Sequence, residues 1–167
     1  MSKLTALAVS IAVLGAIWAY LAFGPLAGSV LVWVGFIAWG SYFHSGGDAT
    51  ALQKTIVGMI YGAIIAGVAL ALVGANPAGL GDAIAAPVYV GVTVFLLVIV
   101  ANISLLSVVP ANVYGYAATA GYALSTSTAN LTTTPDLTNP VLLVALSSII
   151  GTLFAAASGK LAGALGK

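Results

Sequence analysis

Long apolar runs without charge dominate this sequence, and they leave few alternatives to a membrane fold. The stretch 4–23 contains no charged residue, and a helix needs about 20 mostly apolar residues to cross a bilayer. Only 4% of the 167 residues are charged and 62% are hydrophobic, whereas a soluble domain carries roughly 25% charged residues. The sequence therefore predicts an all-α protein that lies within lipid as a single transmembrane domain, residues 1–167.

Five segments of the chain are predicted to cross the membrane as helices, and a sixth is less regular. The clear spans are 4–23, 26–43, 55–73, 88–109 and 139–158. The stretch 110–126, PANVYGYAATAGYALST, opens with a proline and is rich in glycine and alanine. Its sequence is compatible with two paths: a complete crossing of the membrane, or a re-entrant segment that returns to the side from which it entered.

The lysines favour a complete crossing by 110–126. Cytoplasmic loops collect lysine and arginine, and six crossings place every lysine on one side: Lys3, Lys54, Lys160 and Lys167. Asp82 and Asp136 then fall on the other side. We predict a bundle of six transmembrane helices with both termini cytoplasmic and with a short fifth helix broken at Pro110. Six spans can also form two halves of three, inverted relative to each other.

Composition excludes several kinds of chemistry. The chain has no cysteine, one histidine and three aspartates, which leaves no thiolate and too few ligands for a metal site of three or four side chains. A net charge of +1 offers no basic patch for nucleic acid. The histidine lies in a predicted loop, away from any nucleophile inside the bundle. We expect no enzymatic activity, no cofactor and no metal.

Polar side chains gather between the second and third predicted spans, in the sequence WGSYFHSGGDATALQK. Gly46 and Gly47 release the backbone from helical geometry, and Asp48 or Ser45 could cap the next helix. On this structural interpretation the segment is a solvated turn. On a functional interpretation, His44, Gly46, Gly47 and Asp48 form the cytoplasmic mouth or gate of a pore, and His44 would respond to protonation.

Neutral hydrogen-bonding residues follow one another on either side of Pro110. Tyrosine is the only ionisable residue type in the predicted apolar cores, whereas ion and proton carriers usually place an Asp, Glu or His there. Breaks in membrane helices tend to line cavities or to be buried against protein. The predicted solute path therefore comprises Asn102, Asn112, Tyr114, Tyr116, Thr119 and Tyr122. The structural alternative is hydrogen bonding between helices, worth about 0.6 kcal/mol for each bond.

Small residues are predicted to bring helices together, because close backbone approach drives helix association in lipid. The predicted packing positions are Gly58, Gly62, Gly115 and Gly121. Packing inside the bundle is the simpler interpretation, and a subunit interface of a homo-oligomer is the other.

Three blocks of the sequence resemble the YcdZ-like family of small bacterial inner-membrane proteins, a domain of unknown function. They are WGSYFHSGGD, LQKTIVGMIYGAIIAG and LLSVVPANVYGYAATAGY, at 39–48, 52–67 and 105–122. The resemblance implies a multi-pass protein of the bacterial inner membrane and supplies no activity. Members of the family commonly have a small residue at the position of His44, so a histidine gate would be peculiar to this chain.

These residues predict a passive channel or facilitator for a small, neutral, hydrogen-bonding solute of the urea, short amide or polyol class. One alternative is a membrane scaffold or accessory subunit that transports nothing. Another is a proton-linked transporter that uses His44. The expected partners are the lipid bilayer, the solute and further copies of the chain.

Overall fold

The computed structural model describes residues 1–166, and within that range the ordered elements are all helical. The α-helices are α1 (Lys3–Phe23), α2 (Val32–His44), α3 (Ala49–Ala75), α4 (Asp82–Ile99), α5 (Val109–Ser125) and α6 (Pro140–Leu165). Short 3₁₀ turns occupy Val100–Asn102, Ser104–Leu106 and Ala129–Leu131. The predicted all-α class is confirmed.

Four segments are long and apolar enough to cross a membrane: Lys3–Phe23, Ala49–Ala75, Asp82–Asn102 and Pro140–Leu165. The remaining two helices are shorter, with 13 residues in α2 and 17 in α5. At 1.5 Å per residue they reach about 20 and 26 Å, against a hydrocarbon core of about 30 Å.

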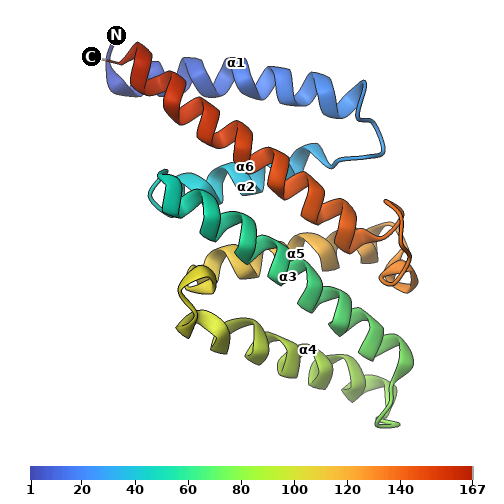
Figure 1. Cartoon of the computed structure of the whole chain (residues 1–167). Coiled ribbons are helices and arrows are strands. Elements are labelled where there is room, and N and C mark those ends of the chain that lie inside the picture. The colour runs from blue at the N-terminus through green and yellow to red at the C-terminus, as the bar shows by residue number, and fades with distance from the viewer. Residues whose placement is uncertain (167) are drawn as a thin grey trace.

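Consecutive helices run in opposite directions along one axis of the molecule (Figure 1). Both chain ends, the α2–α3 turn and the α4–α5 connection therefore lie toward the same end of this axis, on the left in Figure 1. Lys3, Lys54 and Lys160 lie on segments that start or finish there, and we call it the lysine end. Asp82 and Asp136 lie at the opposite end. Lys167 falls outside the described residues.

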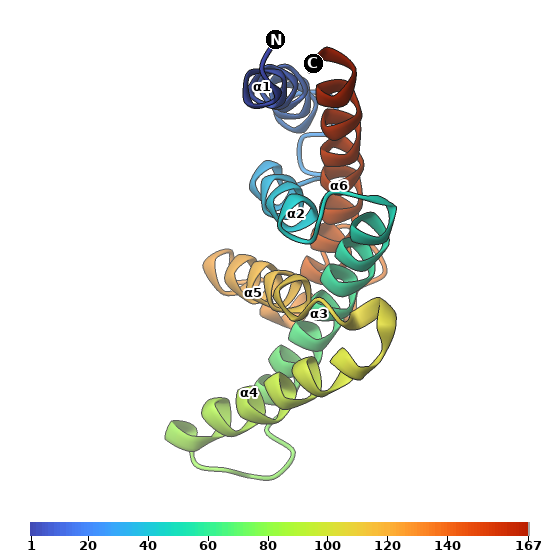
Figure 2. The same ribbon diagram turned by 90° about the vertical axis from the view of Figure 1, so that its left-hand side faces the viewer.

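The helices form an open, layered arrangement (Figure 2). The first layer contains α1, α2 and α5 side by side. The second contains α6 and α3, which cover one side of the first layer and contact each other. Helix α4 lies at the far end, against α3. Apart from their contact with each other, α6 packs mainly on α1 and α2, whereas α3 packs mainly on α5 and α4.

Glycines allow two of these crossings to be very close. A Cβ atom on Gly62 of α3 would overlap the backbone of Asn112 on α5, and one on Gly115 would overlap the backbone of Met59. A Cβ on Gly151 of α6 would overlap the backbone of Gly35 on α2.

The four predicted packing glycines do not all behave alike. Gly58 belongs to the α3–α5 crossing with Gly62 and Gly115, because its added Cβ would lie 2.9 Å from the Cβ of Ala111. Gly121 is different: it is exposed, and nothing within residues 1–166 lies within 4 Å of an added Cβ.

Several predicted boundaries are wrong, each for a local reason. The second helix starts at Val32 instead of residue 26, because Pro25 and Gly28, with φ of 79°, lie in a turn. The third starts at Ala49 instead of 55, because Asp48 caps it. The fourth starts at Asp82 and accommodates Pro87 in its first half.

The predicted break inside the fifth helix is also wrong. Helix α5 is continuous, and Pro110 occupies its first turn, where the missing N–H has no helical partner to lose. The interruption comes earlier, over 100–108, where the chain forms two 3₁₀ turns between α4 and α5.

Candidate functional site

The polar turn between α2 and α3 is built mainly by its own hydrogen bonds. Gly46 and Gly47 have φ of 115° and 68°, values that favour glycine. The Tyr42 hydroxyl donates to the Gly47 carbonyl at 2.5 Å. Asp48 accepts a hydrogen bond from the backbone N–H of Ala51 at 2.7 Å, so its carboxylate is engaged as the N-cap of α3.

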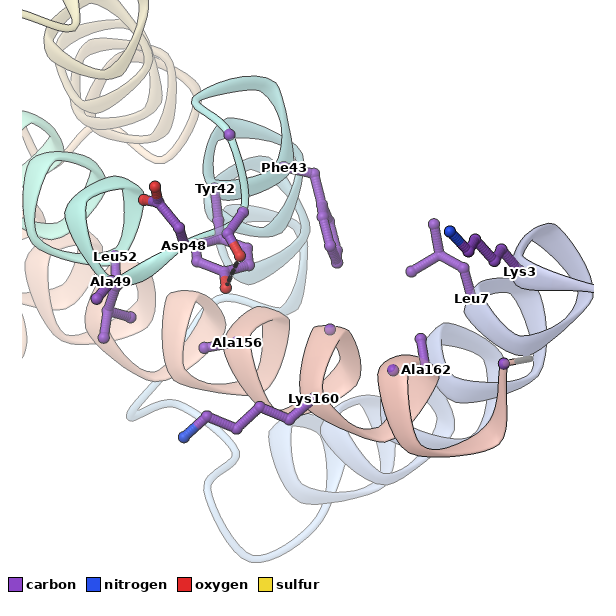
Figure 3. A pocket seen from close by; sticks show the side chains of 15 residues that line it. Lys3, Leu7, Tyr42, Phe43, Asp48, Ala49, Leu52, Ala156, Lys160 and Ala162 are labelled. Carbon is purple, nitrogen blue, oxygen red and sulfur yellow. Dashed lines mark hydrogen bonds between the residues drawn. The ribbon is translucent and has the colours of Figure 1, made fainter.

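A cavity of about 620 Å³ opens beside this turn at the lysine end. We call it the end cavity; it lies between the start of α1, the α2–α3 turn and the last turns of α6 (Figure 3). Three of the four residues of the predicted mouth, Gly46, Gly47 and Asp48, line it together with Lys3 and Lys160. Its walls are apolar, with Leu7, Phe43, Leu52 and Ala162 among them.

His44 faces a different hollow. A groove of about 490 Å³ runs between α2 and α5, and we call it the α2–α5 groove. Its polar side chains are Ser41, His44 and Tyr114. The rest of its lining is apolar: Trp33, Phe36, Ile37, Gly40, Ala117 and Ala118. Trp33 and Phe36 are 40% and 44% exposed, so one side of the groove is open in the single chain.

Asn112 and Thr119 are fully buried in the packing of α5. The Asn112 side-chain amide donates to the carbonyls of Leu97 at 3.3 Å and Leu106 at 3.1 Å. The first bond attaches the end of α4 to the start of α5, and the second attaches the 100–108 connection to it. The Oδ1 of Asn112 and the Oγ1 of Thr119 have no hydrogen-bond partner in the described part of the chain.

The other predicted path residues lie apart from these two. The Tyr116 hydroxyl is 3.2 Å from Thr93 Oγ1 on α4. Asn102 is exposed, donates to the Ile99 carbonyl at 3.2 Å and lines a third hollow of about 340 Å³. Tyr122 is half-buried near the end of α5.

The predicted solute path is therefore not one cavity. Only Tyr114 of its six residues lines the α2–α5 groove, and the 620 Å³ end cavity contains none of them. Successive side chains of a helix point in different directions, so the path residues on α5, which are spaced by two or three positions, face different neighbours.

Sequence reasoning missed two groups that the fold brings to these hollows. Ser41 is buried, with its Oγ 3.4 Å from Thr55 Oγ1, and it reaches the groove beside Tyr114 from another helix. Lys3 and Lys160 both line the end cavity although they stand near opposite ends of the chain. Sequence spacing predicts neither arrangement, because both depend on how the helices pack.

At the opposite end of the molecule, the α5–α6 connection holds its carboxylate by local bonds. Thr138 donates to Asp136 from its hydroxyl at 2.5 Å and from its backbone N–H at 2.9 Å. These two hydrogen bonds hold the pKa of Asp136 below its ordinary value.

Comparison with known proteins identifies one family. Its description reads "Protein of unknown function (DUF1097)", and the match covers residues 8–163. No curated protein and no solved structure matches the chain. The match confirms the domain of unknown function indicated by the three sequence blocks, while the YcdZ-like name stays a prediction.

Proposed function

Because the chain belongs to the DUF1097 family, whose description assigns no activity, we propose its function from its own residues. The protein is a passive facilitator for a small, neutral, hydrogen-bonding solute in the bacterial inner membrane. It crosses the bilayer six times with the lysine end on the cytoplasmic side, and it catalyses no reaction.

The alternating direction of the six helices supports six crossings (Figure 1). Lys3, Lys54 and Lys160 share one end of the molecule, in keeping with the tendency of lysine to remain cytoplasmic. Helices α2 and α5 are short, so their crossings would include irregular backbone next to each helix. Such backbone is tolerated at membrane depth where protein buries it. Val30, just before α2, is 5% exposed.

Matching burial in α3 and α6 supports an arrangement of two inverted halves, α1–α3 and α4–α6. When Gly62 is aligned with Gly151, further buried residues of α3 fall on buried residues of α6. The α3 residues are Ala51, Thr55, Gly58, Met59, Ala63, Ala66 and Ala69, and their α6 counterparts are Pro140, Val144, Ser147, Ser148, Thr152, Ala155 and Ser158. Only Gly67 and Leu143 lack a buried counterpart.

The other helix pairs match at part of their buried positions. Aligning Trp18 with Leu97 matches buried Ala6 and Ser10 of α1 with buried Ala85 and Tyr89 of α4. Aligning Gly35 with Gly115 matches buried Ala38 and Trp39 with buried Ala118 and Thr119. The packing partners also exchange, since α6 holds α1 and α2 while α3 holds α4 and α5.

One hydrogen bond recurs at the matched positions. Trp18 Nε1 donates to the Val32 carbonyl at 2.9 Å in the first half. In the second half Asn112, which aligns with Val32, donates to the carbonyl of Leu97, which aligns with Trp18, at 3.3 Å. The same two places thus join the first and second helices of each half, with donor and acceptor exchanged.

The α2–α5 groove is the proposed solute path, and the observation that carries it is the meeting of Ser41, His44 and Tyr114 from both halves in one hollow. Transporters built from repeats bind their substrates at the repeat interface, and α2 and α5 occupy equivalent places in the two halves. The lining contains no carboxylate and no lysine, so selectivity would come from width and from hydrogen-bond donors and acceptors.

A further copy of the chain would close the open side of this groove, since a polar solute must be separated from hydrocarbon. This is why we propose a homo-oligomer as the working form. The open space at Gly121 and at Gly40, which have nothing within 4 Å of an added Cβ, leaves room for close approach.

The test is solute flux into liposomes that contain the purified protein, measured by swelling with urea, short amides and polyols. We expect flux above that of protein-free vesicles. Gly40→Leu should reduce it at least tenfold, because leucine would fill the groove without overlapping the fold. The matched control is Gly91→Leu on the exposed surface of α4, which should keep the flux.

Flux no faster than in protein-free vesicles for every solute would overturn the facilitator and favour the second candidate, a scaffold or accessory subunit. The tight burial of Asn112 and Thr119 favours that candidate, since packed helices alone need no path. A proton-linked mechanism makes a separate prediction: flux that changes with pH in the parent chain and loses that change in His44→Ala.

A further inference from the structure

The residues that line the end cavity indicate the chemistry of a ligand that it could bind. Leu7 and Phe43 supply hydrocarbon on one side, and the α6 surface at Gly159, Ala162 and Gly163 is nearly free of side chains. Nothing in the described chain lies within 4 Å of an added Cβ at Gly163. The volume of about 620 Å³ lies within the usual range of ligand pockets, roughly 300–1,000 Å³.

Positive charge surrounds this apolar space. Lys3 and Lys160 line the end cavity, one from the start of α1 and the other from the end of α6 (Figure 3). The one carboxylate in the lining, Asp48, points toward α3 and accepts the hydrogen bond of its N-cap. The Tyr42 hydroxyl is likewise engaged, with the Gly47 carbonyl. Figure 3 shows Lys3 and Lys160 extending in different directions from two sides of the cavity, and neither ammonium is held by Asp48 or Tyr42, so each remains for a negatively charged group at the rim.

We propose that the end cavity binds an anionic phospholipid. Its phosphate lies at the rim of the cavity, where the long side chains of Lys3 and Lys160 can reach it, and an acyl chain lies along Phe43 and the bare surface of α6 at Gly163. A free anion would leave the apolar walls uncovered, and a zwitterionic headgroup would bring its own ammonium toward the lysines. Basic pockets between membrane helices near the cytoplasmic surface recognise anionic headgroups by this combination.

The inference extends beyond the solute path, and it depends only on the protein lying in a membrane. Its readout is lipid bound to the protein, so a failure of solute flux leaves it standing, and its own failure leaves the α2–α5 groove untouched.

The experiment is native mass spectrometry of the full chain in detergent, titrated with phosphatidylglycerol or phosphatidylcholine of identical acyl chains. We expect clear preference for phosphatidylglycerol. Lys160→Ala should weaken its binding about fivefold, the effect of one lysine near an anionic surface, and Lys3→Ala should do the same. The matched control is Lys54→Ala, which removes the same charge at the same end but outside the cavity, where its ammonium contacts Ser107 Oγ at 3.0 Å.

A steric variant tests the acyl-chain wall without changing charge. Gly163→Leu should fill the cavity and weaken phosphatidylglycerol binding, whereas Gly91→Leu should not. Equal weakening by Lys54→Ala and Lys160→Ala would overturn the proposal, because general attraction of charge would then account for binding. Unchanged binding in Gly163→Leu, or displacement of the lipid by inorganic phosphate alone, would also overturn it.

Discussion

Glycine is required at the helix crossings because a side chain there would enter a neighbouring backbone. The α3–α5 crossing depends on Gly62 and Gly115, whose added Cβ atoms would overlap backbone atoms of Asn112 and Met59. Backbone atoms cannot move away as the end of a flexible side chain can, so the overlap is removed only if the two helices separate. In lipid that separation loses the close packing on which helix association relies.

Gly62→Ala should therefore destabilise the protein by at least about 1–3 kcal/mol, the usual cost of overpacking. The matched control is Gly74→Ala on the same helix, where nothing lies within 4 Å of an added Cβ. There alanine should be neutral or stabilising by up to about 1 kcal/mol. Reversible unfolding in mixed detergent micelles measures both, and equal stability of the two variants would contradict the crossing.

The bond between Trp39 and Ser158 offers a second test at single residues. Trp39 Nε1 donates to Ser158 Oγ at 3.1 Å, and both residues are buried. A cycle of Trp39→Phe, Ser158→Ala and the double variant should give a coupling of about 0.6–1.7 kcal/mol, the range measured for bonds between membrane helices. A coupling of zero would show that the two side chains do not act together.

Among the elements, the 100–108 connection depends on one side chain. Its 3₁₀ turns have few backbone bonds of their own, and Asn112 holds the Leu106 carbonyl from inside α5. In Asn112→Ala we expect faster amide hydrogen exchange over 100–108 and little change in α1 or α6. Val113→Ala is the matched control, since Val113 is 40% exposed at the next position of α5. Slow exchange in both variants would exclude this role for Asn112.

The sequence predicted the positions of the helices better than their ends. Apolar runs identify each helix because lipid requires them, but caps and turns decide where a helix begins. Asp48 caps α3 at its start, so the helix includes residues 49–54 before the predicted apolar span, Lys54 among them. Pro110 suggested an interruption of the fifth helix, but a proline in the first turn of a helix does not interrupt it. Apolar periodicity does not reveal that α5 begins next to this proline.

The candidate site depends on the whole molecule, and less of it could be predicted. The turn at Gly46 and Gly47 could be found because glycine at positive φ is a local property. The meeting of Ser41 with Tyr114 could not, because it depends on the packing of α2 beside α5. A path along one helix was the natural expectation from sequence spacing, whereas the fold distributes those residues over several faces.

Six crossings can be tested directly, because the chain has no natural cysteine. Single cysteines at Ser2 and Ser45 should react with an impermeant maleimide only from the cytoplasmic side. Cysteines at Ala78 and Ser127, in the connections at the opposite end, should react only from the other side. Labelling of Ser45→Cys and Ala78→Cys from the same side would contradict six crossings.

The exchange of packing partners between α3 and α6 has a consequence for biosynthesis. Helices α1 and α2 make few contacts with each other and rest mainly on α6, whose 26 residues follow the other five helices in translation. The earliest helices therefore remain without their main packing partner until synthesis reaches α6. A nascent chain that stalls before residue 140 would leave two unassembled helices for membrane quality-control proteases to recognise.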